Sequence, residues 1–162
     1  MSLQQELGIK HSIEPLETEV NMNLWFTREQ SFILHSRLFR QYNLTSTQFV
    51  ILYILQDGGA PLTIRKIADR LTKSFPGTTG LIDRLEKEGL VTRERCATDR
   101  RVVYVTLTDK GQATFLELGN LLRKLHEKLF GHLTKAELKE FIWLFEKARE
   151  RLIPLLAEQK DD

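Results

Sequence analysis

One central segment constrains the fold of this chain most, because it places two short amphipathic helices on either side of a tight turn. In "PLTIRKIADRLTKS" the apolar residues fall at helical spacing, and Thr63 precedes them as a helix N-cap. In "SFPGTTGLIDRLEKEGLV" the residues Thr78, Ile82 and Leu85 repeat at helical spacing, and Gly89 supplies a left-handed stop. Two short helices joined in this way are the elements of a helix-turn-helix.

A β-hairpin is predicted directly after these helices. The stretches "LVTRER" and "RVVYVTL" are rich in β-forming residues and flank the turn-like "CATD". The combination predicts a winged helix-turn-helix, a mainly α fold in which a small β-hairpin forms the wing.

Long apolar helices flank this central unit on both sides. Capping boxes at Thr45 with Gln48 and at Thr134 with Glu137 mark two helix starts, and Thr108 precedes a third. The long helices carry more apolar surface than a chain of 162 residues covers easily, so we expect a symmetric dimer, with a monomeric helical bundle as the alternative.

Bulk properties fit a single compact protein that acts inside the cell. The chain is 41% hydrophobic, and it has no apolar run long enough to cross a membrane. Its N-terminal stretch lacks the basic and apolar regions of a secretory signal, and one cysteine cannot form an internal disulfide. We therefore expect a cytoplasmic protein without a membrane partner.

Positive charge is concentrated in the central third of the sequence. The range 63–110 holds 11 Lys and Arg against 7 Asp and Glu, whereas the rest of the chain is slightly acidic. Such a footprint suits a polyanion, although a solvated surface explains it nearly as well. Phosphate contacts are expected from Arg65, Lys66, Lys73 and Arg84.

The second short helix has the composition of a DNA-reading helix. Its N-terminal half is small and polar, so that it can enter a major groove, and its hydroxyl groups can contact bases or phosphates. Capping and packing within a helix are the alternative use of the same residues. The residues concerned are Ser74, Gly77, Thr78 and Thr79.

Arginines at the tip of the hairpin add a probe for the minor groove. Arg93, Arg95, Arg100 and Arg101 concentrate positive charge on a thin projection, and arginine is drawn to a narrow minor groove. Asp99 fits beside phosphates if it orients Arg101 or Arg84 through a charge-assisted hydrogen bond. A solubilising turn is the alternative for the hairpin taken alone.

These segments together resemble the MarR family of bacterial transcription regulators. The quoted matches are the D-R-L-E run at 83–86, the G-L-V run at 89–91, the wing tip Asp99-Arg100-Arg101 and the L-T-x-x-G start at 107–111. The resemblance is dense over residues 44–115. Gly80 departs from the larger polar or basic residue often found there, which shifts base readout to its neighbours.

The resemblance implies a function as well as a fold. It implies a homodimer that binds a double-stranded operator, with Arg101 in the minor groove, and release by a small aromatic or phenolic ligand. We accordingly expect an N-terminal arm (1–18, flexible), a dimerisation helix (19–43), a winged helix-turn-helix (44–108) and C-terminal dimerisation helices (109–162).

Other functions have weaker support in the sequence. Cys96 could sense oxidants, but no second cysteine could resolve a sulfenic acid, and the four scattered histidines predict no metal site or cofactor. The sequence contains no recognisable catalytic motif that would indicate an enzyme. A winged helix that binds protein or ligand instead of DNA is the competing class. Trp25, Phe26 and Phe32 could line a ligand pocket or form the dimer core.

Overall fold

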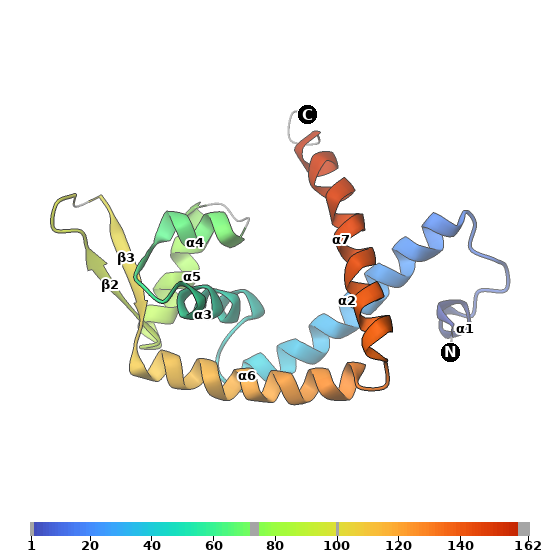
Figure 1. The fold of residues 1–162 in the computed structure, drawn as a ribbon, viewed down its shortest axis with the longest axis horizontal. Helices are drawn as coiled ribbons and strands as arrows, with labels where there is room; N and C mark the ends of the chain where they lie inside the picture. The colour runs from blue at the N-terminus through green and yellow to red at the C-terminus, as the bar shows by residue number, and fades with distance from the viewer. Residues whose placement is uncertain (1, 72–74, 100, 159–162) are drawn as a thin grey trace. The chain divides into compact units, whose positions relative to one another are not determined.

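The computed structural model describes residues 2–71, 75–99 and 101–158, and Figure 1 shows the helices and strands that they form. The chain divides into two compact units. The first unit is Met1–Leu116 and the second is Glu117–Asp162. In chain order the elements are α1 (Leu3–Leu7), α2 (Leu16–Arg40), α3 (Ser46–Gly58), β1 (Leu62–Thr63), α4 (Ile64–Leu71), α5 (Phe75–Lys87), β2 (Val91–Arg95), β3 (Val103–Leu107), α6 (Asp109–Phe130) and α7 (Lys135–Glu158).

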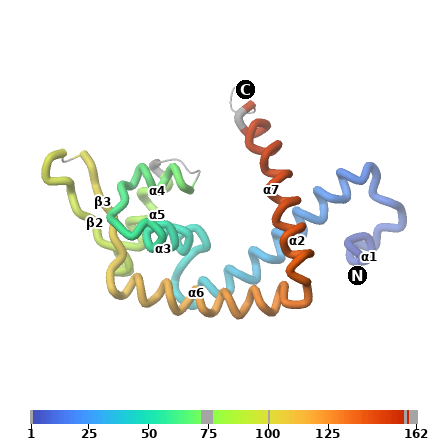
Figure 2. The backbone as a smooth tube through the Cα atoms, in the orientation of Figure 1, coloured from blue at the N-terminus to red at the C-terminus, as the bar shows by residue number. Residues whose placement is uncertain are grey.

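The core of the first unit lies where α3, α4 and α5 pack with the sheet. Each of these helices, and each strand of the hairpin, contributes at least one fully buried apolar side chain, and the winged-helix prediction is confirmed. Figure 2 traces the backbone of these elements. The fully buried apolar side chains of this core are Ile51, Leu52, Ile67, Ile82, Leu85, Val91 and Val105.

Caps predicted from the sequence start and stop the helices of this core. The side chain of Thr45 and the side chain of Gln48 form a reciprocal capping box at α3. The backbone N–H of Lys66 donates to Thr63 Oγ1 over 3.2 Å at the start of α4. Gly89 has φ +70° and ends α5, since a left-handed residue costs glycine little.

A three-stranded antiparallel sheet forms the wing, in the order β1-β3-β2. The hairpin register runs from Val91 opposite Leu107 to Arg95 opposite Val103, and β1 adds Leu62 opposite Val105. The predicted hairpin is therefore present. Strand β1 was not predicted, because two residues are too short to show an alternating pattern.

The arm expected over residues 1–18 contains an ordered element. Ser2 and Gln5 form a capping box at the start of α1, and Gly8 ends it in the left-handed conformation with φ +64°. Leu3 is buried. This short helix was not predicted, because a single helical turn is too short to show a period. The flexible arm expected over residues 1–18 stays a prediction.

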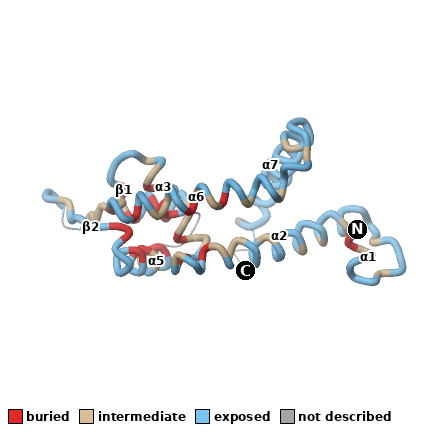
Figure 3. The backbone as a smooth tube through the Cα atoms, turned by 90° about the horizontal axis from the view of Figure 1, so that it is seen from below, coloured by how far each residue is buried: buried red, intermediate tan, exposed pale blue. Residues whose placement is uncertain are grey.

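Most of the backbone of α2 and α7 is coloured as exposed in Figure 3. Large apolar side chains are among these exposed residues, on α2 in the first unit and on α7 in the second. On α2 they are Leu16, Val20, Leu24, Trp25, Phe32, Ile33 and Leu34. On α7 they are Phe141, Ile142, Trp143, Leu144, Phe145, Leu152, Ile153, Leu155 and Leu156. Within the described residues, no helix combines the length and the apolar character that a membrane span requires.

The first turn of α6 caps the carbonyl groups at the end of α5. Thr108 Oγ1 donates to the Gly89 carbonyl over 2.7 Å and accepts from the Gly111 N–H over 2.9 Å. The Thr108 N–H donates to the Leu90 carbonyl, and Lys110 Nζ donates to the Glu88 carbonyl. The carbonyl groups of the turn at residues 88–90, directly after α5, are thus satisfied by residues at the start of α6.

Replacement of Gly111 by alanine should disrupt this junction. A Cβ at Gly111 would lie 1.9 Å from the Leu90 carbonyl oxygen, so the backbone has to move. We expect Gly111→Ala to lower the free energy of unfolding by about 1–3 kcal/mol, measured by urea denaturation at fixed protein concentration. Gly80→Ala is the control, because its Cβ would meet nothing within 4 Å. Equal stability of the two variants would contradict the junction described here.

Candidate nucleic-acid interface

One side of α5 is buried, and only residues on its other sides can contact a ligand. Thr78 is 0% exposed and lies on the same helix face as the fully buried Ile82 and Leu85. The prediction that the Thr78 side chain contacts bases is therefore wrong. Its spacing of four and seven residues to Ile82 and Leu85 already placed it on the inner face of the helix.

The opposite side of α5 is exposed and carries small residues. Gly77 and Gly80 are exposed, and a Cβ at Gly80 would meet no atom within 4 Å. Thr79 is half-buried between them, and Arg84 is exposed further along the helix. The absence of side chains at both glycines lets another backbone or a groove wall approach α5 closely.

Three of the predicted site residues lie outside the part of the chain that the structure describes. They are Lys73, Ser74 and Arg100. Of the remaining predicted phosphate-binding residues on α4, Arg65 and Lys66 are both exposed.

Asp99 shapes the tip of the wing. Its Oδ1 accepts a hydrogen bond from the Arg101 backbone N–H over 3.0 Å and lies 3.9 Å from Arg101 Nε. Its carbonyl accepts from the Val102 N–H, and the Cys96 N–H donates to the Val102 carbonyl. Asp99 thus pairs with Arg101, the first of the two partners considered for it, and mainly builds the turn that presents Arg101.

Arg101 and Arg93 have opposite environments in the same wing. The Arg101 side chain is 97% exposed, whereas that of Arg93 is 22% exposed and is paired with Asp83 and Glu86 of α5. The prediction that Arg93 adds free positive charge to the projection is wrong, because two carboxylates compensate it. Sequence reasoning missed this pairing, since the partners lie on a different element.

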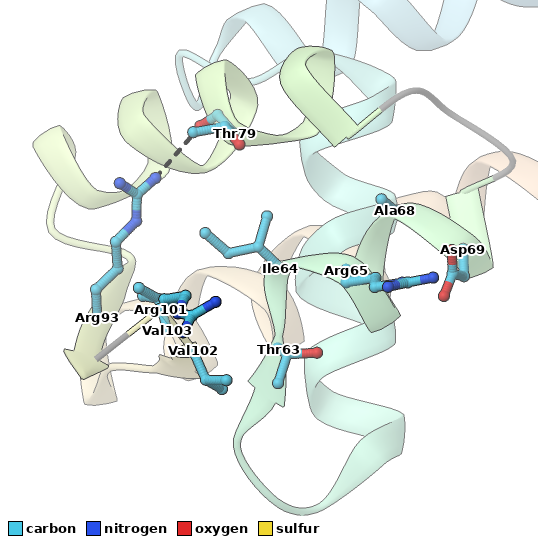
Figure 4. A pocket seen from close by; sticks show the side chains of 10 residues that line it. All are labelled: Thr63, Ile64, Arg65, Ala68, Asp69, Thr79, Arg93, Arg101, Val102 and Val103. Atoms are coloured by element: carbon cyan, nitrogen blue, oxygen red, sulfur yellow. Dashed lines mark hydrogen bonds between the residues drawn. The ribbon is translucent and has the colours of Figure 1, made fainter. Parts of the chain in front are cut away.

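A cleft of about 900 Å³ lies between α4, α5 and the wing (Figure 4). Among the described residues, three arginines line it, Arg65 from α4, Arg93 from β2 and Arg101 from the wing tip, together with one carboxylate, Asp69. Thr79 reaches it from α5. The cleft therefore joins Thr79 of α5 to the tip of the wing in one concavity, in which the charge of Arg93 is compensated and Arg65 and Arg101 are exposed.

The predicted pocket aromatics lie elsewhere, on α2. Trp25 and Phe32 are exposed and Phe26 is half-buried, and the rings of Trp25 and Phe26 meet edge to face at 4.8 Å. None of the three lines the cleft beside the wing. Across the described residues, no group of three or more His, Cys, Asp or Glu side chains could hold a metal ion.

Cys96 sits in the wing with its Sγ 3.2 Å from Thr98 Oγ1. The hydrogen bond from the Thr98 hydroxyl is the main cause that lowers the pKa of the Cys96 thiol, and backbone hydrogen bonds from Asp99 and Thr98 add to it. A lower pKa means that more thiolate is present at a given pH.

Alkylation of Cys96 by iodoacetamide should therefore reach half its maximal rate at a lower pH than a free cysteine does. Thr98→Val removes the main hydrogen bond and should move that midpoint to higher pH. Thr92→Val, on the same wing but without this contact, should leave it unchanged. The alkylation rates are obtained by mass spectrometry of aliquots quenched at successive times. An unchanged midpoint in Thr98→Val would contradict the assigned cause.

Comparison with known proteins relates this chain to one family of proteins in sequence and in fold. The MarR family model matches residues 44–103, the range that spans α3 to the start of β3. The transcriptional regulator MgrA of Staphylococcus aureus is 34% identical over 105 residues, which are 65% of this chain and 69% of MgrA.

Solved structures agree with the sequence comparison. A MarR transcription factor from Planctomyces limnophilus is 37% identical with a TM-score of 0.66, over 83% of this chain and 98% of that one. A mutant MarR from E. coli, solved with operator DNA, is 25% identical with a TM-score of 0.69, over 91% and 99%. In both sequence and fold, therefore, the chain belongs to the MarR family of transcription regulators, which are DNA-binding proteins and not enzymes.

Proposed function

We propose that the chain is a homodimeric repressor that binds a pseudo-palindromic operator and reads two adjacent grooves in each half-site. Helix α5 would enter the major groove and Arg101 the neighbouring minor groove. The observation that carries this proposal is the position of Arg101, fully exposed at a narrow tip and lining the same cleft as Thr79 of α5. A minor groove about 6 Å wide admits a single extended side chain of this kind.

Base readout would fall on few residues of α5. Thr79 offers a hydroxyl group, while Gly77 and Gly80 allow the helix backbone to approach the base edges. The lack of a long side chain at Gly80 makes shape and hydration contribute more to recognition than direct hydrogen bonds do.

Phosphate contacts would supply much of the affinity. Arg65, Lys66 and Arg84 are exposed on α4 and α5, and charges of this kind hold the backbone of DNA without reading its sequence. The same role is proposed for Lys73 and Arg100, and a base or phosphate contact for Ser74, all three of which lie outside the described residues.

A DNA partner is also supported by a relative. The E. coli MarR mutant was solved in complex with operator DNA, and its likeness to this chain extends over almost its full length. By analogy, two copies of this chain would place their α5 helices in successive major grooves, about 34 Å apart.

A homodimer accounts for the apolar surfaces of α2 and α7. Apolar side chains on these helices, including Trp25, Phe32, Ile142 and Trp143, are about half exposed or more in the single chain. Exposed apolar side chains in such number on one helix mark an interface with a partner. An isologous dimer would cover the same surface on both copies.

Release by a small aromatic or phenolic ligand is the regulatory part of the proposal. Trp25, Phe26 and Phe32 would bind it beside the dimer core. The hydrogen bond from the Thr108 hydroxyl, at the start of α6, to the Gly89 carbonyl supports this mechanism, because it would pass a change in the direction of α6 to the turn that ends the recognition helix. The ligand would favour a dimer in which the two α5 helices no longer match successive grooves.

Arg101→Ala should weaken binding to the operator by roughly tenfold or more. An operator is first selected from random-sequence DNA, and affinities are then measured by fluorescence anisotropy over a series of salt concentrations. Asp99→Asn keeps an oxygen that accepts from the Arg101 N–H, so it should weaken binding less than Asp99→Ala does. Arg101→Ala with wild-type affinity and wild-type sequence preference would rule out the minor-groove contact.

The mass in solution should be that of two chains. Light scattering at micromolar concentration should give twice the 18.9 kDa of the single chain. Ile142→Glu places a charge on the apolar surface of α7 and should shift the mass toward one chain, whereas Lys139→Glu, exposed on the same helix, should not. A mass near 18.9 kDa for the wild type would exclude the dimer.

A further inference from the structure

Arg93 is an arginine of the wing that does not point away from the protein. It lies on β2, and its side chain crosses to α5, where the guanidinium approaches Thr79 (Figure 4). Only 22% of this side chain is exposed, in contrast to Arg101 at the tip of the same wing. Its environment is that of a residue that joins two elements.

One guanidinium contacts α5 at three positions along the helix. Arg93 Nη2 lies 2.5 Å from Asp83 Oδ1 and donates to the Thr79 carbonyl over 3.3 Å. Arg93 Nε lies 3.6 Å from Glu86 Oε2. Positions 79, 83 and 86 are spaced by four and three, so they form one stripe along α5. A single side chain from the wing therefore holds about two turns of the recognition helix.

The chemistry of these contacts requires arginine. The planar guanidinium presents several N–H donors in a fixed fork, whereas lysine presents one compact charge on a flexible stem. Arg93 Nε is buried and has no hydrogen-bond partner among the described residues, so the 3.6 Å approach to Glu86 is its main electrostatic contact. Partly exposed ion pairs add little stability, so the consequence of this cluster is geometric.

This contact sets the relation between the two proposed DNA-reading parts. Thr79 belongs to the helix proposed for the major groove, and Arg101 to the wing proposed for the minor groove. Arg93 is bonded to the first of these and lies on the strand that leads to the second. The pairing also compensates charge on Asp83 and Glu86, two carboxylates that α5 would otherwise carry toward DNA phosphates.

We propose that Arg93 is a positioning residue that fixes the wing onto the recognition helix, so that Arg101 and Thr79 reach adjacent grooves at the same time. The residue acts on specificity through α5 and the wing and does not itself contact DNA. This inference rests on the proposed function of the chain as an operator-binding regulator.

The first test compares specific and nonspecific DNA binding by the 162-residue chain. Arg93→Lys keeps the charge and loses the fork, and Arg93→Ala loses both. Both should lower the ratio of operator affinity to random-DNA affinity by roughly tenfold. The slope of log affinity against log salt should stay at the wild-type value, because no phosphate contact is lost. Thr92→Ala is the matched control on the same strand, because Thr92 is exposed and uncharged and has no proposed DNA contact.

The second test observes the wing without DNA. Cys96 is the only cysteine in the chain and lies in the wing, so a nitroxide label attached there reports wing motion without a further substitution. Arg93→Lys and Asp83→Asn should both increase the mobility of the label in electron paramagnetic resonance spectra. Thr92→Ala, exposed on the same strand, should leave it unchanged. Thermal melting of each variant confirms that the chains compared are folded.

Several results would overturn the proposal. Arg93→Lys with the wild-type affinity ratio and label mobility would remove the positioning role. A salt slope reduced by about 0.9 in Arg93→Ala, with both affinities lowered equally, would make Arg93 a direct phosphate contact. A wild-type protein that binds all DNA alike would overturn the proposed function itself, and the positioning role with it. If the wild type prefers the operator and Arg93→Lys shows the same preference, only the positioning role would be overturned.

Discussion

The burial of Ile82 and Leu85 against the core is the constraint on which the rest of this structure depends. Both side chains are fully buried, so the rotation of α5 about its own axis is fixed by packing. Thr78 is carried inward with them. Gly77, Gly80 and Thr79 remain toward the outside, and the stripe through Asp83 is turned toward the wing. The packing of these two side chains in the core thereby determines which α5 residues can contact a DNA groove and which can contact the wing.

Two sets of polar contacts then tie α5 to its neighbours. Arg93 connects α5 to the wing, and the Thr108 hydroxyl connects the end of α5 to α6. Gly111 permits the second connection, since any side chain there would collide with the Leu90 carbonyl. The recognition helix is consequently held at its side and at its end by groups that are not themselves proposed to touch DNA.

Much of this architecture could be predicted from the sequence, because local signals agree with one another. The capping residue Thr45, the stop at Gly89 and the β-forming runs around the wing each predicted an element that the structure contains. Strand β1 and helix α1 were missed, since neither is long enough to show a period. The burial of Thr78 could have been recognised, because its spacing to Ile82 is that of an inner-face residue.

The candidate site was harder to predict than the fold, because its geometry depends on contacts between elements. A sequence shows four arginines near the wing, but it does not show that Arg93 faces two carboxylates while Arg101 faces solvent. Likewise, the shared cleft between α4, α5 and the wing exists only once these elements are packed. The charge counts predicted a polyanionic partner. Only the tertiary structure shows which arginine is exposed and able to contact that partner.

Footprinting of the protein on a selected operator tests the central claim most directly, since it reports the two grooves separately. Dimethyl sulfate reports guanine N7 in the major groove, and hydroxyl radicals report sugars along the minor groove. The account predicts major-groove protection in each half-site with minor-groove protection beside it, and Arg101→Ala should lose only the latter. Minor-groove protection that persists in Arg101→Ala, or that is absent from the wild type, would contradict the account.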